Sequence, residues 1–420
     1  MVYRDNESYM TNLKADRPSL ALEPESVKYD ILVAGSLAAD LNCDYNPLAG
    51  DLSGLKTPSL RTSNPAEFSQ SVGGVGHNIA LAGHYAGAST LLCSAVGDDM
   101  AGRTLIEQVR SEGLSVSGVQ VLDSKDSRTA QYVAINDLNK DLFVAAADMS
   151  ILSSQTLESS DYWERQISRY RPKWVVVDAN WSTPILSNIV TAAHLNDALV
   201  AFEPVSVQKS YRLIELLKPD DTFPNTKLDL ITPNSLELES MFIAAQKSQF
   251  FESHSWWRVI NSLNLPGAGD RLARMTSPKL VDRGVPQQSL QLLPYVPHIL
   301  TKLGSLGCLL TQLLSPSDTR LQDPDYAPYI LSRADGEGSI SGGVYLRLFP
   351  PAEVLVKGDV VSVNGAGDTL MGVAIARLVR QGSGTHLEDV ILDAQKAAIA
   401  SLRSREAVSR DLRGLFGSTA

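Results

Sequence analysis

Cysteine is scarce in this chain. The 420 residues contain three, Cys43, Cys93 and Cys308, and they lie far apart. An odd and scattered set excludes a disulfide framework and lacks the close pairs typical of zinc or redox sites. Free thiols of this kind are typical of a reducing compartment, so we expect a cytoplasmic protein.

Long apolar runs are also missing. No stretch reaches the roughly 18 apolar residues that a membrane-spanning helix needs, so no membrane partner is expected. The first residues lack the apolar core of a signal peptide. We interpret residues 1–28 as a polar, flexible leader and residues 416–420 as a tail.

Positive charge is in deficit. Lys and Arg total 37 against 47 Asp and Glu, which gives a formal net charge of -10. Proteins that bind nucleic acid without sequence preference are usually basic, so a nucleic-acid partner is not expected. With 44% hydrophobic and 20% charged residues, the composition is otherwise that of an ordinary globular protein.

What the chain does have is a regular alternation of short apolar runs with helix-like segments. This alternation predicts an α/β fold with a mostly parallel sheet covered by helices on both faces. Ligands bind such sheets at the carboxyl ends of the strands. We expect strands at residues 29–35, 66–71, 90–96, 174–178, 198–203, 228–232, 298–303 and 307–313, and helices at 76–86 and 101–112.

Three segments depart from this alternation. Residues 128–147 alternate polar and apolar residues on either side of a turn, which predicts a hairpin or edge ribbon. Residues 244–294, with a Trp-Trp pair and a Gln/Leu-rich stretch, are interpreted as a helical insertion. Residues 315–343 are polar and are interpreted as a loop insertion.

The most informative motif is VSVNGAGDTL at residues 361–370, which a helix-like run follows. We expect a strand, a turn and a helix start. Gly365, Ala366 and Gly367 are small enough for the backbone to surround an anion with free N–H groups. Asp368, in the first helical turn, can accept a proton from a hydroxyl, and this combination suits phosphoryl transfer to an alcohol. The alternative is an ordinary glycine-rich turn.

The same four letters occur a second time, in Pro-Gly-Ala-Gly-Asp at residues 266–270. No clear buried strand precedes this copy, and Pro278 interrupts the segment after it. We interpret it as a coincidence within a loop, which makes Asp270 an internal control for Asp368.

Polar residues near the first strand suit a sugar ligand. Asp40 follows the strand and has two oxygens that can hold two hydroxyls. Gly73 and Gly74 bring bare backbone close to a ligand, and the Asn78 amide is both donor and acceptor. The alternatives are a capping or turn aspartate and a tight glycine turn. We interpret the neighbouring His77 as structural.

Two further motifs follow later strands. Asn234 and Glu237 share one side of a helix start and suit a hydrated Mg²⁺ held through waters, although a capping pair would have the same spacing. Lys302, Gly304 and Gly307 let a nucleotide phosphate approach between two strands, and the alternative is a glycine-rich hairpin turn.

In this order, the motifs resemble those of the ribokinase-like (PfkB) family of carbohydrate and nucleoside kinases, from about residue 29 to about residue 411 apart from the two insertions. The resemblance implies a kinase domain over residues 29–415. Its fold would be a three-layer α/β/α sandwich with a mostly parallel central sheet and a small β lid at 128–147. The resemblance also implies ATP and Mg²⁺, an anion hole at residues 365–367 and Asp368 as the catalytic base.

The resemblance also implies where the two ligands would bind. The substrate would bind with its hydroxyls near Asp40 and its base near the lid, where alternate strand residues share one face. ATP would lie between residues 304–307 and residues 394–404. The substrate-binding set is then Asp40, Gly73, Gly74, Asn78, Thr129 and Gln131, and the ATP-binding set is Lys302, Gly304, Gly307, Asn364, Ala398 and Ser401.

Within the family, VAAADMSIL at 144–152 and FEPVSVQKS at 202–210 are most similar to pseudouridine kinases. This implies phosphorylation of the 5′-hydroxyl of pseudouridine. The alternatives are another sugar or nucleoside kinase, such as a ribokinase, fructokinase or adenosine kinase, and a non-catalytic nucleoside sensor. A third alternative, a dinucleotide-dependent oxidoreductase, is disfavoured because Gly35 is followed by Ser-Leu-Ala-Ala instead of the required glycines.

Three residues depart from the family pattern. Ser362 and Val363 occupy the places of an Asp and a Thr, which argues against a monovalent-cation site. Ala38 occupies the place where ribokinases commonly have Asn, which argues against free ribose. The resemblance leaves two partner relationships open, a homodimer and a functional pairing with a pseudouridine-monophosphate glycosidase.

Overall fold

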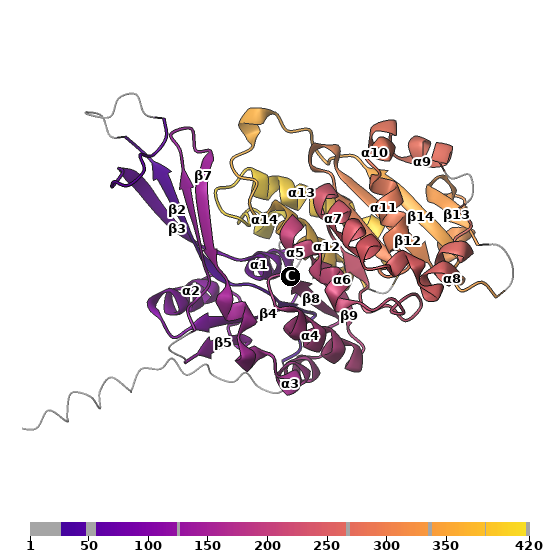
Figure 1. Cartoon of the computed structure of the whole chain (residues 1–420), viewed down its shortest axis with the longest axis horizontal. Coiled ribbons are helices and arrows are strands. Elements are labelled where there is room, and N and C mark those ends of the chain that lie inside the picture. Colours follow the sequence, from indigo (N-terminus) through magenta and orange to yellow (C-terminus); the bar gives the residue numbers. More distant parts are fainter. Residues whose placement is uncertain are drawn as a thin grey trace, which may run out of the picture.

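The computed structural model describes residues 27–47, 56–123, 127–265, 269–334, 338–382 and 384–416 (Figure 1). The expected leader at 1–28 and tail at 416–420 lie almost wholly outside these residues. Among the described helices, none combines the length and apolar character that crossing a membrane requires.

A ten-stranded sheet forms the centre of the molecule, in the order β13-β14-β12-β11-β10-β9-β8-β1-β4-β5. The pairs from β11 to β5 are parallel, and those of β12, β14 and β13 are antiparallel. The strands are β1 (Ile31–Ala34), β4 (Thr90–Gly97), β5 (Val119–Leu122), β8 (Trp174–Asp178), β9 (Leu199–Glu203), β10 (Leu230–Ile231), β11 (His298–Lys302), β12 (Cys308–Leu314), β13 (Ile330–Arg333) and β14 (Gly343–Phe349).

Helices cover both faces of this sheet because its strands are apolar on both sides. In β1, Leu32 and Ala34 belong to one buried cluster, whereas Ile31 and Val33 belong to the other. The second cluster contains α1 (Val75–Tyr85), α2 (Met100–Ser111), α12 (Ala366–Gln381), α13 (Leu387–Leu402) and α14 (Leu412–Phe416). The first contains α3 (Ser160–Tyr170), α4 (Thr183–Leu195), α6 (Arg212–Leu216), α7 (Ser235–Lys247), α8 (His254–Ser262), α9 (Gly269–Met275), α10 (Pro278–Asp282) and α11 (Val285–Leu292), and the short α5 (Val207–Ser210) packs on α7. The expected three-layer α/β/α fold is confirmed.

A smaller four-stranded sheet projects from the body as the lid (Figure 1). The predicted hairpin supplies β6 (Gln131–Asn136) and β7 (Leu142–Asp148). The other half comes from β2 (Ala38–Tyr45) and β3 (Ala66–Gly73), so the strand order is β3-β2-β6-β7. Because only three residues separate β1 from β2, the chain passes directly from the central sheet into the lid.

The expectation of a strand just before the glycine-rich motif is wrong. Residues 361–364 form a bend and a turn, and the 3₁₀ helix η8 (Lys357–Asp359) precedes them. The N–H groups of Val361 and Ser362 donate to the Leu402 carbonyl at 2.8 and 3.2 Å, at the end of α13. The Val361 and Val363 side chains are exposed, so their apolar alternation does not mark a buried strand.

The insertions differ in how far they follow the expectation. The described residues of 244–294 are mostly helical, from the end of α7 through η4 (Phe250–Glu252) to α11. The interpretation of 315–343 as a loop is incomplete, because this segment contains η6 (Thr319–Leu321), η7 (Ala327–Tyr329) and strand β13. Ile330 and Leu331 are buried in β13, but four residues between turns are too few for a clear periodic signal. The remaining 3₁₀ turns are η2 (Ser150–Ser153), η3 (Gln155–Leu157) and η5 (Gly304–Leu306).

Candidate active site

Asp368 lies where the glycine-rich motif enters α12. Gly365 caps this helix with a φ of 75°, a left-handed conformation that glycine adopts without strain. The Asn78 side-chain Nδ2 donates to Asp368 Oδ2 at 2.9 Å, so residues 290 positions apart meet here. Burial and the nearby Glu203 carboxylate raise the pKa of Asp368 to about 7, against the opposing effects of the Asn78 hydrogen bond and Lys302. Asp368 can therefore accept a proton near neutral pH.

A fixed positive charge lies beside the same motif. Lys302, at the end of β11, places its Nζ 2.8 and 3.0 Å from the two Glu203 carboxylate oxygens. A Cβ added to Gly367 would lie 3.1 Å from that Nζ, so the ammonium is adjacent to the loop backbone. Burial alone lowers the pKa of Lys302, but the carboxylates of Glu203, Glu237 and Asp368 outweigh it and raise the pKa above its usual value. The loop and the ammonium together suit an anion.

Asp40 and the first glycine pair come together at the junction of lid and body. Asp40 belongs to lid strand β2, and a Cβ on Gly73 would lie 2.1 Å from Asp40 Oδ2. Gly74 has a φ of 98° and is the N-cap residue of α1. Burial raises the pKa of Asp40 to about 6, although His77 acts in the opposite direction. Asn78 N–H donates to the Gly74 carbonyl at 3.0 Å, and the binding of a sugar by these residues stays a prediction.

The lid residues expected near the substrate base have different surroundings. Thr129 is 1% exposed, and its hydroxyl accepts from Gly97 N–H at 2.9 Å and donates to Asp99 Oδ1 at 2.6 Å. Its side chain is thus used to join β4 to the start of α2 and is not available to a substrate. Gln131 opens β6 opposite Ala39 of β2, and its contact with a substrate stays a prediction.

The Asn234–Glu237 pair forms a capping box at the start of α7. Asn234 Oδ1 accepts from the N–H groups of Leu236 and Glu237 at 2.9 and 3.0 Å, and Glu237 Oε2 accepts from Asn234 N–H at 2.8 Å. The capping pair, the alternative to a magnesium site for this motif, is therefore formed in the structure. It leaves Glu237 Oε1 outside the capping box, and burial raises the pKa of the Glu237 carboxyl.

The side chains near the site fit Mg²⁺ only if water and phosphate supply most of its ligands. No group of three or more His, Cys, Asp or Glu side chains within the described ranges could hold a metal ion. Mg²⁺ often keeps several waters and binds one or two carboxylates together with substrate phosphates. Glu237, whose charge acts on Lys302, is a carboxylate of this kind, so the residues suit a metal held mainly by water and phosphate.

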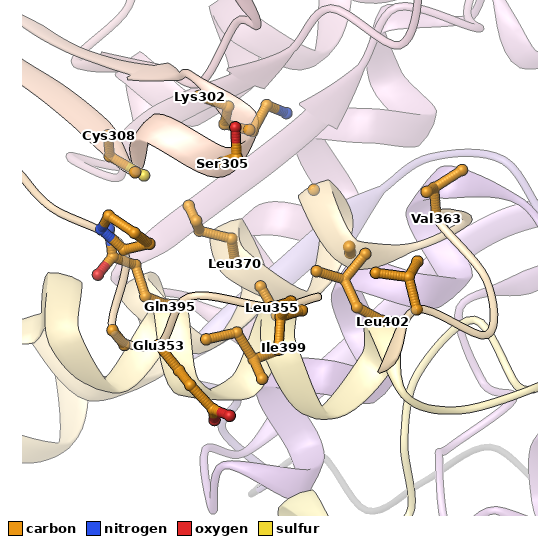
Figure 2. A pocket seen from close by; sticks show the side chains of 18 of the residues that line it. Lys302, Ser305, Cys308, Glu353, Leu355, Val363, Leu370, Gln395, Ile399 and Leu402 are labelled. Atoms are coloured by element: carbon orange, nitrogen blue, oxygen red, sulfur yellow. The ribbon is translucent and has the colours of Figure 1, made fainter. Parts of the chain in front are cut away.

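A largely apolar cavity of about 440 Å³ adjoins the motif (Figure 2). Figure 2 shows Leu370 of α12, Ile399 and Leu402 of α13 and Leu355 of the segment before η8 on one side of the cavity. Lys302 and Ser305 lie on the strand side. Of the residues expected to bind ATP, Lys302, Gly304, Gly307 and Ala398 line this cavity.

Two of the expected ATP-binding residues lie elsewhere. Ser401 has no exposed surface, and its hydroxyl contacts Thr369 Oγ1 at 2.9 Å and accepts from Ser409 N–H at 3.2 Å. The Ser401 hydroxyl therefore packs against α12 inside the protein, and it is not available to a nucleotide. Asn364 is exposed on the loop, outside the cavity lining, and its contact with ATP stays a prediction.

The second copy of the motif lies far from this site. Residues 266–268 are outside the described residues, and Asp270 is an exposed residue in the first turn of α9. In Figure 1, α9 lies at the β13–β14 end of the molecule, away from α12.

Residues 31–252, more than half of the chain, match the family described as pfkB family carbohydrate kinases. The chain belongs to this family. Membership indicates a phosphotransferase that acts on a hydroxyl group.

Individual relatives agree with this assignment. A pseudouridine-metabolizing bifunctional protein of Schizosaccharomyces pombe is 30% identical over 403 residues, which cover 94% of this chain but only 48% of that protein. The pseudouridine kinase of Escherichia coli is 28% identical over 230 residues, or 53% of this chain and 72% of that protein. The chain thus spans about half the length of the first of these relatives.

A solved structure confirms the fold. The ribokinase of Cryptococcus neoformans in complex with ADP superposes with a TM-score of 0.57 at 18% identity, covering 93% of this chain and 99% of the ribokinase. The ribokinase-like fold is therefore shown independently of the sequence match.

Sequence reasoning missed four charged or polar residues that the fold brings to the same edge of the kinase sheet. Asp178 ends β8, where its Oδ2 accepts from Ser36 N–H and hydroxyl at 2.7 and 2.8 Å. Glu203 ends β9 and accepts from the Thr232 hydroxyl in addition to Lys302. In the sequence, the signal for Asp178 and Glu203 was a carboxylate at the end of an apolar run, where ligands of a parallel sheet bind. The four are Asp178, Asn180, Glu203 and Lys209.

Lys209 and Asn180 extend this polar network. Lys209 Nζ donates to Asn180 Oδ1 at 2.5 Å, and Asn180 Nδ2 donates to the Ser36 hydroxyl at 3.0 Å. Burial lowers the pKa of Lys209, and Arg212 acts in the same direction against Asp178. Asp178 also raises the pKa of Asp368, so the network acts electrostatically on that carboxyl.

Proposed function

We propose that this chain transfers the γ-phosphoryl group of ATP to the 5′-hydroxyl of a ribosyl nucleoside, and that the nucleoside is pseudouridine. The observation that carries the proposal is the combination at the start of α12. A carboxyl with a pKa of about 7, the start of α12, where backbone N–H groups lack intrahelical acceptors, and a lysine ammonium lie beside an apolar cavity.

Each part has a separate task in phosphoryl transfer. Asp368 accepts the proton of the 5′-hydroxyl as that oxygen attacks the γ-phosphorus and the bond to the β-phosphate oxygen breaks. The N–H groups of residues 365–367 and the Lys302 ammonium stabilise the negative charge that spreads over the transferred group. The apolar cavity between η5 and α13 suits the adenine ring.

Mg²⁺, when bound, would neutralise charge on the phosphates, and Glu237 is the residue proposed to hold its water shell. Burial raises the pKa of Glu237, and the Lys302 ammonium acts against that change. Glu237 Oε2 accepts from the Asn234 N–H, which leaves Oε1 of the same carboxylate for a water of this shell.

On the acceptor side, Asp40 and Asn78 would hold the sugar hydroxyls. Asp40 lies beside the bare backbone of Gly73, Asn78 N–H donates to the Gly74 carbonyl, and the Asn78 amide already points at Asp368. A sugar held there has its 5′-hydroxyl directed at the proposed base. Pseudouridine is the nucleoside named for two relatives, one of which resembles 94% of this chain.

The test is a phosphorylation assay of the purified chain with ATP and Mg²⁺. The acceptors are pseudouridine, uridine, adenosine, ribose and fructose, and the readouts are ADP release and the mass of the product. Uridine is the matched control, because it differs from pseudouridine only in the atom that joins base and sugar. We expect a strong preference for pseudouridine.

Other outcomes would separate the alternatives. Preference for ribose, fructose or adenosine would keep the kinase chemistry and overturn the substrate. Tight nucleoside binding without any product would overturn the kinase activity and favour a nucleoside sensor. A functional pairing with a glycosidase, as the bifunctional relative suggests, would additionally require that the phosphorylated product is a substrate of that enzyme.

A further inference from the structure

A buried histidine lies next to the amide that contacts Asp368. His77 is 2% exposed, and its Nε2 lies 2.7 Å from Oε2 of Glu112, at the end of α2. Its other ring nitrogen, Nδ1, lies 3.4 Å from Asn78 Oδ1. The contacts therefore run from Glu112 through His77 and Asn78 to Asp368 without a break.

The hydrogen bonds fix which atoms of this chain of contacts are donors. Asn78 Nδ2 donates to the Asp368 carboxylate, so Asn78 Oδ1 is the atom that faces His77. An oxygen is an acceptor, and so is the Glu112 carboxylate on the other side of the ring. The ring thus lies between two acceptors, and which of its nitrogens donates depends on its tautomer.

Charged groups on the surrounding elements lie near the ring. Glu112 contacts the ring directly, and the Asp40 carboxylate of β2 is close enough for His77 to lower the pKa of Asp40. On the far side, Arg413 of α14 donates to the Glu112 carbonyl at 2.8 Å and lies over the Tyr85 ring. Two carboxylates thus face His77, and Arg413 holds the end of α2 in place.

We propose that the His77–Glu112 contact is a positioning device for the base: it holds the Asn78 amide so that its NH₂ group points at Asp368. This inference rests on the proposed role of Asp368 and goes beyond the structural role expected for His77. Without Glu112, the ring loses the contact that fixes its orientation, and the amide loses its support on one side. Asp368 then loses the donor that lowers its pKa.

The informative variant is Glu112→Ala, which removes the group that His77 Nε2 contacts. Its matched control is Glu107→Ala on the same helix, because Glu107 is 69% exposed and pairs only with Arg110 in the described contacts. The readout is kcat against pH. For Glu112→Ala we expect the midpoint of the acidic limb to move upward by about one pH unit, the size of one lost charge-assisted hydrogen bond. For Glu107→Ala we expect no shift.

A second background separates positioning from general damage. In Asn78→Ala, the amide is already absent, so adding Glu112→Ala should move the acidic limb no further. An unshifted limb in Glu112→Ala, or an equal further shift in the Asn78→Ala background, would overturn the inference. A uniform loss of kcat at every pH would also do so, since it would indicate a structural role only. Full activity in Asp368→Asn would instead overturn the proposed function.

Discussion

At the scale of the residue, Asp368 is held in surroundings that disfavour its charge. Its folded-state pKa is about 7 against an ordinary value of 3.8, because burial and Glu203 oppose ionisation. The folded state therefore binds this proton more tightly than the unfolded chain. The resulting stability is fully present below pH 3.8 and is lost as the pH rises through about 7.

The first prediction concerns Asp368→Asn, which removes both the base and the unfavourable charge. We expect kcat to fall roughly 10²–10⁴-fold, the usual contribution of a positioned base. We also expect the thermal unfolding midpoint at pH 8 to rise, since asparagine needs no ionisation. Turnover with pseudouridine and a melting curve measure the two effects. The control is Asp270→Asn, an exposed residue of the second motif copy, which should change neither; unchanged turnover in Asp368→Asn would exclude it as the base.

The second prediction is the pH dependence of the wild-type chain. Since the base must be ionised, kcat should rise with pH and reach half its maximum near pH 7, the pKa of Asp368. Asp40, with a pKa of about 6, should affect nucleoside binding instead, so KM should increase below pH 6. Initial rates between pH 5 and 9 separate the two parameters. A kcat that is constant from about pH 6 to pH 8 would contradict the assignment of the base.

At the scale of the element, the start of α7 combines a structural and a proposed chemical task. The capping box satisfies the free N–H groups at the start of this helix. A parallel bridge joins Asn234 to Lys302, so the cap also fixes the end of β11 beside the loop. The two interpretations of Asn234 and Glu237 are thus compatible, because only one Glu237 oxygen is needed for the cap.

The variant Glu237→Gln distinguishes the capping role of Glu237 from its proposed role in binding hydrated Mg²⁺. Glutamine can also fill this position of a capping box, so the unfolding midpoint should change little. If Glu237 holds the water shell of Mg²⁺, the Mg²⁺ concentration needed for half-maximal activity should increase severalfold, with little change in nucleoside KM. A Mg²⁺ titration at saturating nucleoside measures this. An unchanged titration would leave Glu237 with the capping task alone.

Elements with a clear period were predictable from the sequence. The buried runs of β1, β4 and β8 and the alternating residues of β6 form strands with the expected bounds within a few residues, because the local pattern alone marks each of them. Residues 361–364 alternate in the same way, but the Leu402 carbonyl and solvent take the place of a neighbouring strand. A local pattern does not contain that information.

The site shows the same division. Asp368 and Asn78 were predictable because each belongs to a local glycine motif. Glu203 and Asp178 were not, because their partners Lys302 and Ser36 lie 99 and 142 residues away and meet them only through the order of the parallel strands. Thr129 shows the opposite case, since its burial against Asp99 is invisible from strand alternation.

At the scale of the whole molecule, the site is divided between two bodies. Asp40 belongs to the lid sheet, whereas Lys302, Asp368 and the apolar cavity belong to the central sheet and its helices (Figure 1). The two ligands would therefore bind to separable half-sites, the nucleoside at the junction of lid and body and ATP on the body alone.

Asp40→Asn tests this division by ligand-induced stabilisation. A ligand at 100 times its Kd stabilises the folded state by about 2.7 kcal/mol, which appears as a higher unfolding midpoint. In the wild-type chain, pseudouridine and a non-hydrolysable ATP analogue should each raise the midpoint. In Asp40→Asn, the shift with pseudouridine should largely disappear, because the sugar hydroxyls lose a charged acceptor, and the shift with the ATP analogue should remain. Loss of both shifts would mean that Asp40 supports the whole site and that the half-sites are not separable.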